Sequence, residues 1–280
     1  MSKSVQPSCS FQQPPENAPL KQESVSIQRA EVQDAATITD ICKRAFHSDV
    51  QVGSGGIGGP PGYDSIDWNS QRIRSGFVHY YKILQDERIV GGFISGWRRK
   101  GYQVCERIFV DPDYHRSGVG SRAFNLVWNE YPGAQLWTLG TPEWNTRTKP
   151  FYEKLGFVQI GITYDVPAWR GRFYEKQITS ERPLLKVAEL EDGTKQVVIE
   201  GTVTKTSPPR TVPSTKTGEN LVLTEAELSD ESGSVSVVLW NEQVGQIHSD
   251  RIRIEEGYVK SYRGKLQLSV SKWGHVISLI

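Results

Sequence analysis

Apolar and polar residues change their rhythm near residue 180, and this change divides the chain into two regions. Before it, short alternating or wholly apolar runs, typical of strands, are interleaved with segments of helical periodicity. The expected strands are VSIQRA, YYKILQ (80–85), IVGGFISGWR (89–98), YQVCERIFV, QLWTLGTP and FVQIGITY, with a turn at Asp86-Glu87. The expected helices are AATITDICKRAF, capped by Asp34, then RAFNLVW, and NTRTKPFYEKLGF, which ends at Gly156. This order predicts a mixed α/β domain.

Beyond residue 183 the pattern is that of strands alone, with Gly, Pro and Asp at the turns. The segments are KQVVIEGTVTKT, LVLTEAELSD, SVSVVLWN, RIRIEEGYVKSY and KLQLSVSKW, and a short helical stretch, EQVGQI, separates the third from the fourth. Strands in this number and arrangement predict a small all-β Greek-key barrel, of which the OB-fold is the commonest form.

These patterns give four expected parts. They are a disordered leader over 1–24, a catalytic α/β domain over 25–177, a linker over 178–183 and an OB-fold barrel over 184–280. The leader is rich in Gln, Pro and Ser and has no apolar core of a signal peptide. The glycine-dense segment 52–65 is either a loop that folds over a ligand or a plain surface loop.

Composition narrows the classes of partner and cofactor. The chain has 33 basic and 32 acidic residues, so any binding of nucleic acid needs a local basic patch. Cys9, Cys42 and Cys105 are widely spaced without a CxxC pair, which argues against a disulfide framework and a zinc site. No apolar run approaches the length of a membrane span. We therefore expect a cytoplasmic protein with no metal and no membrane partner.

Two glycines one residue apart stand where a helix begins, in DPDYHRSGVGSRAFNLVW (111–128). Glycine is a poor helix former, so a structural reason for it is needed. A strand, a glycine turn and a helix opening form an anion site, because exposed N–H groups and the helix dipole attract negative charge. We expect side chains in place of Gly118 and Gly120 to block a phosphate. The pair is also compatible with a tight turn that binds nothing.

The segment ERIFVDPDYHRSGVG, followed by WNTRTKPFYEKLGF, resembles two motifs of the GCN5-related N-acetyltransferases (GNAT) in order and spacing. The resemblance implies acetyl-CoA as acyl donor and an amine, on a protein or a small molecule, as acceptor. It implies that main-chain amides hold the diphosphate, although His115 stands where the family has Gln or Arg. A β-bulge would splay the preceding strand and free main-chain groups for the pantetheine arm. The implied acetyl-CoA-binding residues are Ile108, Phe109, Val110, His115, Arg116, Ser117, Gly118, Val119, Gly120, Ser121 and Asn145.

Transfer to an amine needs a base, since an alkyl amine near pH 7 is almost wholly protonated. The resemblance implies Glu106 as this base, and the alternative is an ion pair with a neighbouring arginine. It implies Tyr152 as the acid that protonates the departing sulfur, and the alternative is core packing. Asn145 either touches the pantetheine or caps the helix. Cys105 has no adjacent histidine, so we expect a buried, inert thiol.

In the barrel, SVSVVLWNEQ (234–243) and EEGYVKSYRGKLQLSV (255–270) resemble archaeal single-stranded DNA-binding proteins of the one-barrel type. The residues that carry the resemblance are Asp230, Gly233, Leu239, Trp240, Tyr258, Tyr262, Gly264, Gln267 and Leu268. It implies that Trp240, Tyr258 and Tyr262 stack on the bases of single-stranded DNA or RNA. The basic residues interleaved with these rings, expected to meet phosphates, are Lys260, Arg263 and Lys265.

The charge of the barrel restrains this interpretation. Residues 183–280 hold 11 basic and 13 acidic residues, a net charge of −2, so the basic residues must share one face to attract a polyanion. We expect Lys205 and Arg210 to extend the basic track, and Trp273 to lie in the core. Barrels of this kind also bind proteins or serve as rigid spacers.

Together these features predict an acetyl-CoA-dependent N-acetyltransferase whose barrel binds single-stranded nucleic acid. Two other interpretations stay open. One is an acyl-CoA sensor that does not turn its ligand over, and the other is a small-molecule acetyltransferase whose barrel mediates assembly. The identity of the acceptor is not readable from the sequence.

Overall fold

The computed structural model describes residues 24–165, 169–214 and 218–280, so the predicted leader lies outside the described residues except for Ser24. In the α/β region the strands and helices are β1 (Val25–Arg29), α1 (Ala35–His47), α2 (Ile66–Arg74), β2 (Val78–Gln85), β3 (Arg88–Arg99), β4 (Tyr102–Val110), α3 (Val119–Asn129), β5 (Leu136–Pro142), α4 (Thr148–Lys154), β6 (Val158–Asp165) and β7 (Trp169–Gln177). The predicted mixed α/β class is confirmed.

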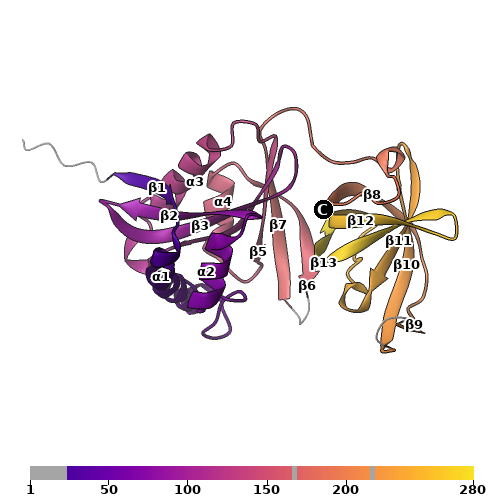
Figure 1. The fold of residues 1–280 in the computed structure, drawn as a ribbon, viewed down its shortest axis with the longest axis horizontal. Coiled ribbons are helices and arrows are strands. Elements are labelled where there is room, and N and C mark those ends of the chain that lie inside the picture. The colour runs from indigo at the N-terminus through magenta and orange to yellow at the C-terminus, as the bar shows by residue number, and fades with distance from the viewer. Residues whose placement is uncertain (1–23, 166–168, 215–217) are drawn as a thin grey trace, which may run out of the picture.

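These strands form one sheet in the order β1-β2-β3-β4-β5-β7-β6, in which only β4 and β5 run parallel. Helices α1 and α2 cover one face and α3 and α4 the other (Figure 1). The two apolar cores follow from the alternation along the strands. Tyr80 and Ile94 pack under α1, whereas Tyr81 and Phe93 pack under α3.

Three local expectations were wrong. The Asp34 side chain does not cap α1, because its carboxylate accepts from the Glu31 amide and pairs with Lys82 at 2.9 Å. The pattern missed α2, which buries the polar residues Asn69 and Ser70 and so carries no apolar stripe. It also missed β7, which is rich in charge and is inserted between β5 and β6.

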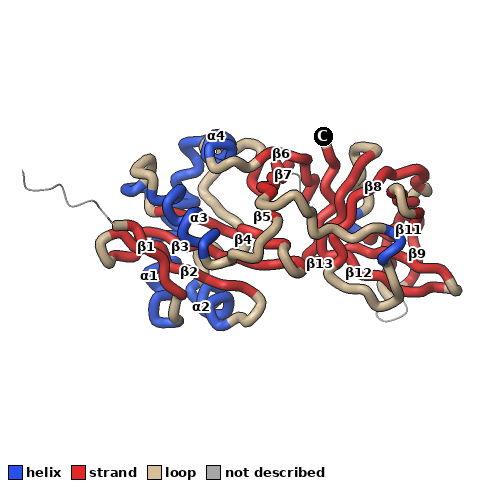
Figure 2. Tube along the Cα trace, turned by 90° about the horizontal axis from the view of Figure 1, so that it is seen from above, coloured by secondary structure: helices blue, strands red, loops and turns tan. Residues whose placement is uncertain are grey.

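The second region is a closed barrel of β8 (Val197–Thr206), β10 (Asn220–Asp230), β11 (Gly233–Trp240), β12 (Arg251–Tyr262) and β13 (Lys265–Leu279), with the short strand β9 (Arg210–Pro213) beside β10. The ring closes in the order β8-β10-β11-β13-β12-β8, around an apolar core. Figure 2 shows that this region consists almost wholly of strands and loops. The five predicted strands are confirmed. Of the predicted helical stretch, only Glu242 and Gln243 are helical, as part of the short 3-10 turn Asn241–Gln243.

The sheet of the first region continues into the barrel, because the end of β13 pairs with β6. Ile277, Ser278 and Leu279 lie opposite Thr163, Ile162 and Gly161. A Cβ at Gly161 would meet the Ile277 side chain and the Ser278 carbonyl oxygen at 2.5 Å, so glycine is needed for this close approach.

Buried charges also join the two regions. Arg253 of β12, with no exposed side-chain surface, bonds Glu175 of β7 and Glu200 of β8. Tyr102 of β4 donates to the buried carboxylate of Glu255. Arg182, inside the predicted linker, bonds Glu175 and Glu200 as well. Arg182 therefore connects the linker to both regions. The domain bounds at residues 177 and 184 stay predictions.

Candidate functional site

Strands β4 and β5 diverge in the first region, and we use the word cleft for the place where they part. They pair only through Tyr102–Val104 and Leu136–Thr138, after which β4 continues beside β3 and β5 beside β7. The register with β3 shifts between Ile94 and Ser95, where Glu106 is the extra residue of a β-bulge. The expected bulge is thus present, and the diverging strands leave main-chain groups of β4 without a partner on β5.

The segment that joins β4 to α3 passes through two residues with left-handed backbone. Arg116 has φ of 64° and Gly118 has φ of 85°, and α3 begins at Val119. The N–H groups of the first turn of a helix have no acceptor within the helix. Those of Val119, Gly120 and Ser121 are therefore oriented out of the helix start, together with its positive dipole end. This backbone fits a diphosphate.

The two glycines serve different purposes. Gly118 supplies the left-handed conformation, and a Cβ there would lie 3.9 Å from the Arg122 guanidinium. A Cβ at Gly120 would meet the Phe151 ring at 3.1 Å and approach Val110. The expectation that both glycines clear the way for a phosphate therefore lacks support at Gly120, where packing against α4 explains the small residue.

The side chain of His115 holds the loop to the strand. Its Nε2 donates to the Val110 carbonyl oxygen at 2.9 Å, and burial lowers the pKa of the ring, which favours the neutral form. The ring is thus engaged within the protein through its Nε2. The Val110 carbonyl is likewise occupied, whereas Ile108 and Phe109 lie in β4 opposite Phe93 and Gly92 of β3.

Glu106 makes the ion pair that was the alternative to a base. Arg72 of α2 contacts its Oε2, and the other carboxylate oxygen packs over Gly96 of β3. Arg107, next in the chain, donates to the Pro61 carbonyl at 3.0 Å and lies over the Trp68 ring. The glycine-dense loop and α2 are thereby docked on the bulge.

Tyr152 is buried on α4, with its ring against Phe124, Phe157 and Tyr174. Burial raises the pKa of its phenol well above the ordinary value, and nearby Cys105, Tyr174 and Asp49 raise it further. These groups belong to β4, β7 and the turn after α1, so three elements meet around Tyr152. The observed ring contacts are those of core packing, the alternative to proton donation.

Asn145 lies in the loop between β5 and α4. Its Oδ1 accepts from the Arg147 amide at 3.1 Å, a bond between residues two apart that orders this loop; α4 itself has no side-chain cap, so the expected capping role is wrong. The carboxylate of Asp49 lies 3.6 Å from the guanidinium of Arg147. Burial raises the pKa of Asp49. Sequence reasoning missed Asp49, since no motif marks it and only the fold brings it beside the cleft.

Cys105 is buried in β4, and burial raises the pKa of its thiol, as expected for an inert cysteine. Within the described ranges, no three His, Cys, Asp or Glu side chains form a group suited to a metal ion. Among the helices of that same part of the chain, none has the length and apolar character needed to span a membrane.

The three aromatic residues predicted to stack on bases lie on one outer surface of the barrel, which we term the aromatic face. Tyr258 lies on β12 between the buried residues Gly257 and Val259, Tyr262 is four residues further on the same side of the strand, and Trp240 follows the buried Leu239 on β11. Strand pairing places the three rings on the same side of the sheet. Tyr258 of β12 lies opposite Ser269 of β13, and Ser269 lies opposite Val238 of β11, two residues before Trp240. Tyr262 is 55% exposed, and Trp240 and Tyr258 are half-buried.

The predicted basic residues accompany these rings. The Lys260 ammonium lies 5.8 Å from the Tyr258 ring centre, and the Arg263 guanidinium 5.2 Å from that of Tyr262. Lys265 is exposed and lies opposite Tyr262 in the hairpin. All three are therefore on the aromatic face or at its edge.

Two expectations for the barrel were wrong. Lys205 and Arg210 do not extend a free basic track, because they pair with Glu227 and Glu225. Trp273 is not in the core: it is 71% exposed, with the Lys272 ammonium 4.7 Å from its ring centre. It lies on the stretch of β13 where pairing with β12 is interrupted, which removes it from the strand alternation.

Comparison with known proteins assigns both regions. Residues 77–159 match the family model of the acetyltransferase (GNAT) domain, and residues 192–278 match that of the single-stranded DNA-binding protein Ssb-like OB fold. The uncharacterized protein YrkN of Bacillus subtilis is 34% identical over 79 residues, which span 28% of this chain and 43% of that protein. The chain thus spans less than half the length of this curated relative.

Among solved structures, PaiA N-acetyltransferase of Thermoplasma acidophilum with coenzyme A is 17% identical, with 55% of this chain and 99% of that chain covered and a TM-score of 0.45. The ribosomal-protein-S18-alanine N-acetyltransferase of Escherichia coli is 18% identical, with 58% and 99% covered and a TM-score of 0.42. The assignment rests on the family models, which match the regions that hold the cleft and the aromatic face. The chain carries a GNAT acetyltransferase domain followed by an OB-fold domain of the Ssb-like type.

Proposed function

We propose that the protein transfers an acetyl group from acetyl-CoA to an amine. The observation that carries this proposal is the diverging β4–β5 pair, with the left-handed Arg116–Gly118 turn at its mouth. The amides of Arg116 to Ser121 would hold the diphosphate. Unpaired main-chain groups near the bulge would hold the pantetheine arm and stabilise charge on the thioester oxygen.

Two side chains of the cleft would move protons. The raised pKa of Tyr152 keeps its phenol protonated at neutral pH, so it is able to donate to a departing thiolate. Glu106 would accept the proton of the amine through the carboxylate oxygen that Arg72 does not contact. Asn145 would act through order in the loop before α4. Holding donor and acceptor side by side would then supply much of the acceleration.

The test is release of free thiol from acetyl-CoA with a panel of protein and small-molecule amines, together with Glu106→Gln. We expect turnover with at least one amine, and a Glu106→Gln variant whose turnover falls more than its affinity for acetyl-CoA. The Arg72–Glu106 ion pair favours a second candidate, an acyl-CoA sensor without turnover. Tight acetyl-CoA binding with no thiol release for any amine would favour the sensor.

We propose further that the aromatic face binds single-stranded DNA or RNA. Exposed rings with adjacent cations support this, since stacking contributes about 1–3 kcal/mol per base and tolerates any sequence. Quenching of tryptophan emission by oligothymidylate, weakened by salt, is the expected result. Unchanged emission at low salt would instead favour a barrel that mediates protein assembly. The acceptor amine, the choice between DNA and RNA and a cytoplasmic location stay predictions.

A further inference from the structure

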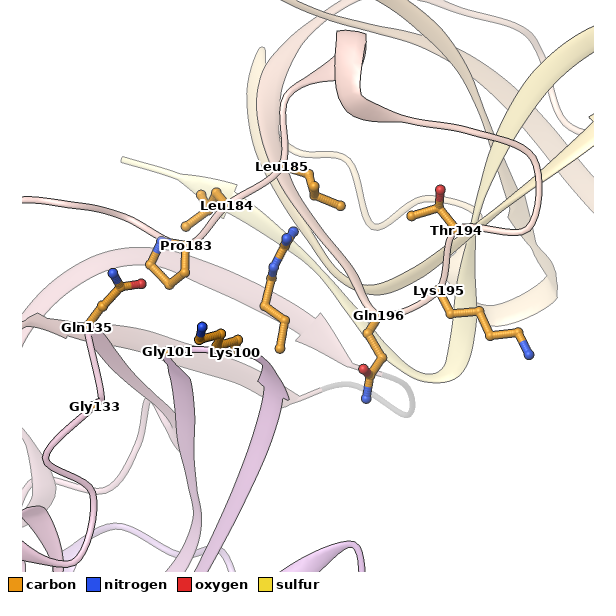
Figure 3. A pocket seen from close by; sticks show the side chains of 11 residues that line it. Lys100, Gly101, Gly133, Gln135, Pro183, Leu184, Leu185, Thr194, Lys195 and Gln196 are labelled. Atoms are coloured by element: carbon orange, nitrogen blue, oxygen red, sulfur yellow. The ribbon is translucent and has the colours of Figure 1, made fainter.

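A cavity of about 530 Å³ lies between the two domains, and we term it the seam cavity (Figure 3). Four segments line it, two from the acetyltransferase region and two from the barrel side. They are Arg99–Gly101 at the β3–β4 turn, Gly133 and Gln135 before β5, Pro183–Leu185 after the linker, and Thr194–Gln196 before β8. The cavity exists only because the domains are fastened together, so neither domain alone would provide it.

The lining of the seam cavity is positively charged. Arg99, Lys100 and Lys195 contribute to it, and no described residue of the lining is acidic. Within the described ranges none of these three cations makes an ion pair. The nearby carboxylate of Glu181 accepts a hydrogen bond from the Gln135 side-chain amide at 3.0 Å. Lys195 extends outward from the rim, whereas Gln135, Pro183 and Leu184 form the opposite wall (Figure 3). Uncompensated cations in a concave site favour an anionic ligand.

Arg99 gives the second, independent observation. Its Nη1 is buried and has no hydrogen-bond partner among the described residues. A buried donor left unpaired costs about 1–3 kcal/mol, so such a group in a native protein requires an explanation. Arg99 lines the cavity, so a rotation of its guanidinium toward a bound anion would give Nη1 the acceptor that it lacks, and a guanidinium is well suited to the oxygens of a phosphate.

The seam cavity adjoins the strand that carries the aromatic face. Thr194 and Gly193 exchange main-chain hydrogen bonds with Val259 of β12, and Asp192 accepts from the Ser261 amide. Val259 and Ser261 alternate on β12 with the outward residues Tyr258, Lys260 and Tyr262. A strand of nucleic acid on those rings would therefore reach the rim of the cavity across a single segment.

We propose that the seam cavity binds phosphodiester groups of a single strand that leaves the aromatic face. This inference rests on the proposed binding of nucleic acid, and it adds a contact made by the acetyltransferase domain itself. A nucleic acid held by both domains would cover the seam, and its phosphate oxygens would accept from the unpaired Nη1 of Arg99.

The test measures fluorescence anisotropy of labelled oligothymidylates of about 5 and about 15 nucleotides with the full chain, near the two ends of the range for one OB fold. In Arg99→Gln we expect the affinity for the long oligonucleotide to fall about tenfold, and the short oligonucleotide to bind as it does to the wild type. The slope of log affinity against log salt concentration, measured for the long oligonucleotide, should become smaller in magnitude by about 1. Arg88→Gln, at the exposed far end of β3, is the matched control and should bind both as the wild type does. Arg99→Lys, which keeps the charge, should recover part of the loss.

The outcomes separate the two proposals. If the wild type binds neither oligonucleotide, the nucleic-acid function fails and the seam site falls with it. If the wild type binds both and Arg99→Gln matches it on the long one, the seam site alone is wrong. Inorganic pyrophosphate and dTMP form the second arm. If either compound binds the wild type but not Arg99→Gln, while Arg99→Gln binds the long oligonucleotide as the wild type does, the cavity belongs to a free phosphate compound and the proposed path of the strand is wrong.

Discussion

The acyl-donor cleft and the aromatic face present their chemistry in opposite ways. In the cleft, the side chains that the motifs mark are occupied within the protein: His115 bonds Val110, Asn145 accepts from the Arg147 amide, and Glu106 pairs with Arg72. On the aromatic face, by contrast, Tyr262 and its neighbouring cations are exposed. The motif of the cleft therefore specifies the shape of the backbone, whereas the motif of the aromatic face specifies side chains that are accessible to a ligand.

The difference has a physical reason. A diphosphate is recognised by fixed N–H groups at a helix start, which require a rigid loop and hence side chains that fasten it. Bases of any sequence are recognised by flat apolar rings, which must remain accessible. Substitutions in the cleft should therefore act through stability and turnover, and substitutions on the aromatic face through affinity alone.

The largest effect is expected from Tyr152→Phe, which keeps the packed ring and removes only the proton donor. We expect turnover to fall about 100-fold or more, within the usual range for an acid catalyst, with the thermal midpoint of unfolding unchanged. Steady-state kinetics and a melting curve measure the two. Tyr174→Phe, a buried tyrosine on the neighbouring strand, is the control. Equal turnover in Tyr152→Phe and the wild type would leave Tyr152 as a core residue only.

The next effect concerns the aromatic face. Tyr262→Ala should weaken binding of oligothymidylate by about 1–3 kcal/mol, with the melting temperature and acetyl transfer unaffected. Trp273→Ala is the control, because the Trp273 ring is also exposed and lies beside a lysine but is not on the aromatic face. It tests whether any exposed ring contributes to binding or only the rings of that face. We expect the Trp273 variant to lose less affinity than the Tyr262 variant. A greater loss in Trp273→Ala would move the nucleic-acid path toward the end of β13.

A smaller effect sharpens the roles of the two glycines. Gly118→Ala forces a side chain into left-handed backbone, at a cost of about 1–3 kcal/mol, and should weaken acetyl-CoA binding by distorting the amides. Gly120→Ala should destabilise the fold by a similar amount through contact with Phe151, yet leave that affinity nearly intact. Calorimetry of acetyl-CoA binding and chemical denaturation distinguish the two. If Gly120→Ala weakened acetyl-CoA binding without destabilising the fold, a side chain at residue 120 would block the phosphate, as first expected.

The smallest effect is a dependence on pH. The pKa of His115 is lowered in the folded protein, so the unfolded chain binds the extra proton first as the pH falls. His115 should therefore contribute stability above about pH 6.5, the ordinary value of histidine, and lose it progressively below that pH. Unfolding free energies at several pH values should show a shallower acid loss in His115→Asn than in the wild type. The pKa of His79 is also lowered, and its contribution cancels because both the variant and the wild type contain it. Parallel curves of unfolding free energy against pH for the two proteins would refute the effect.

Much of both sites was readable before the structure. The strand–turn–helix around Gly118 depends on neighbours in the chain, and the β12–β13 hairpin follows from strict alternation and a turn at Arg263-Gly264. The partners of these residues were not readable. Arg72 lies on a helix without an apolar stripe, and Asp49 follows a helix with no motif at all.

The sequence by itself determined the two folds, the place of the glycine turn before α3 and the residues of the aromatic face, because local periodicity and short motifs encode each of them. Only the tertiary structure decided that β7 enters between β5 and β6, and that Glu106 meets Arg72. It also decided that β13 joins β6 and that a cationic cavity lies at the seam. These features depend on contacts between segments far apart in the chain, and no local pattern specifies which distant strand edge or charge will become a neighbour.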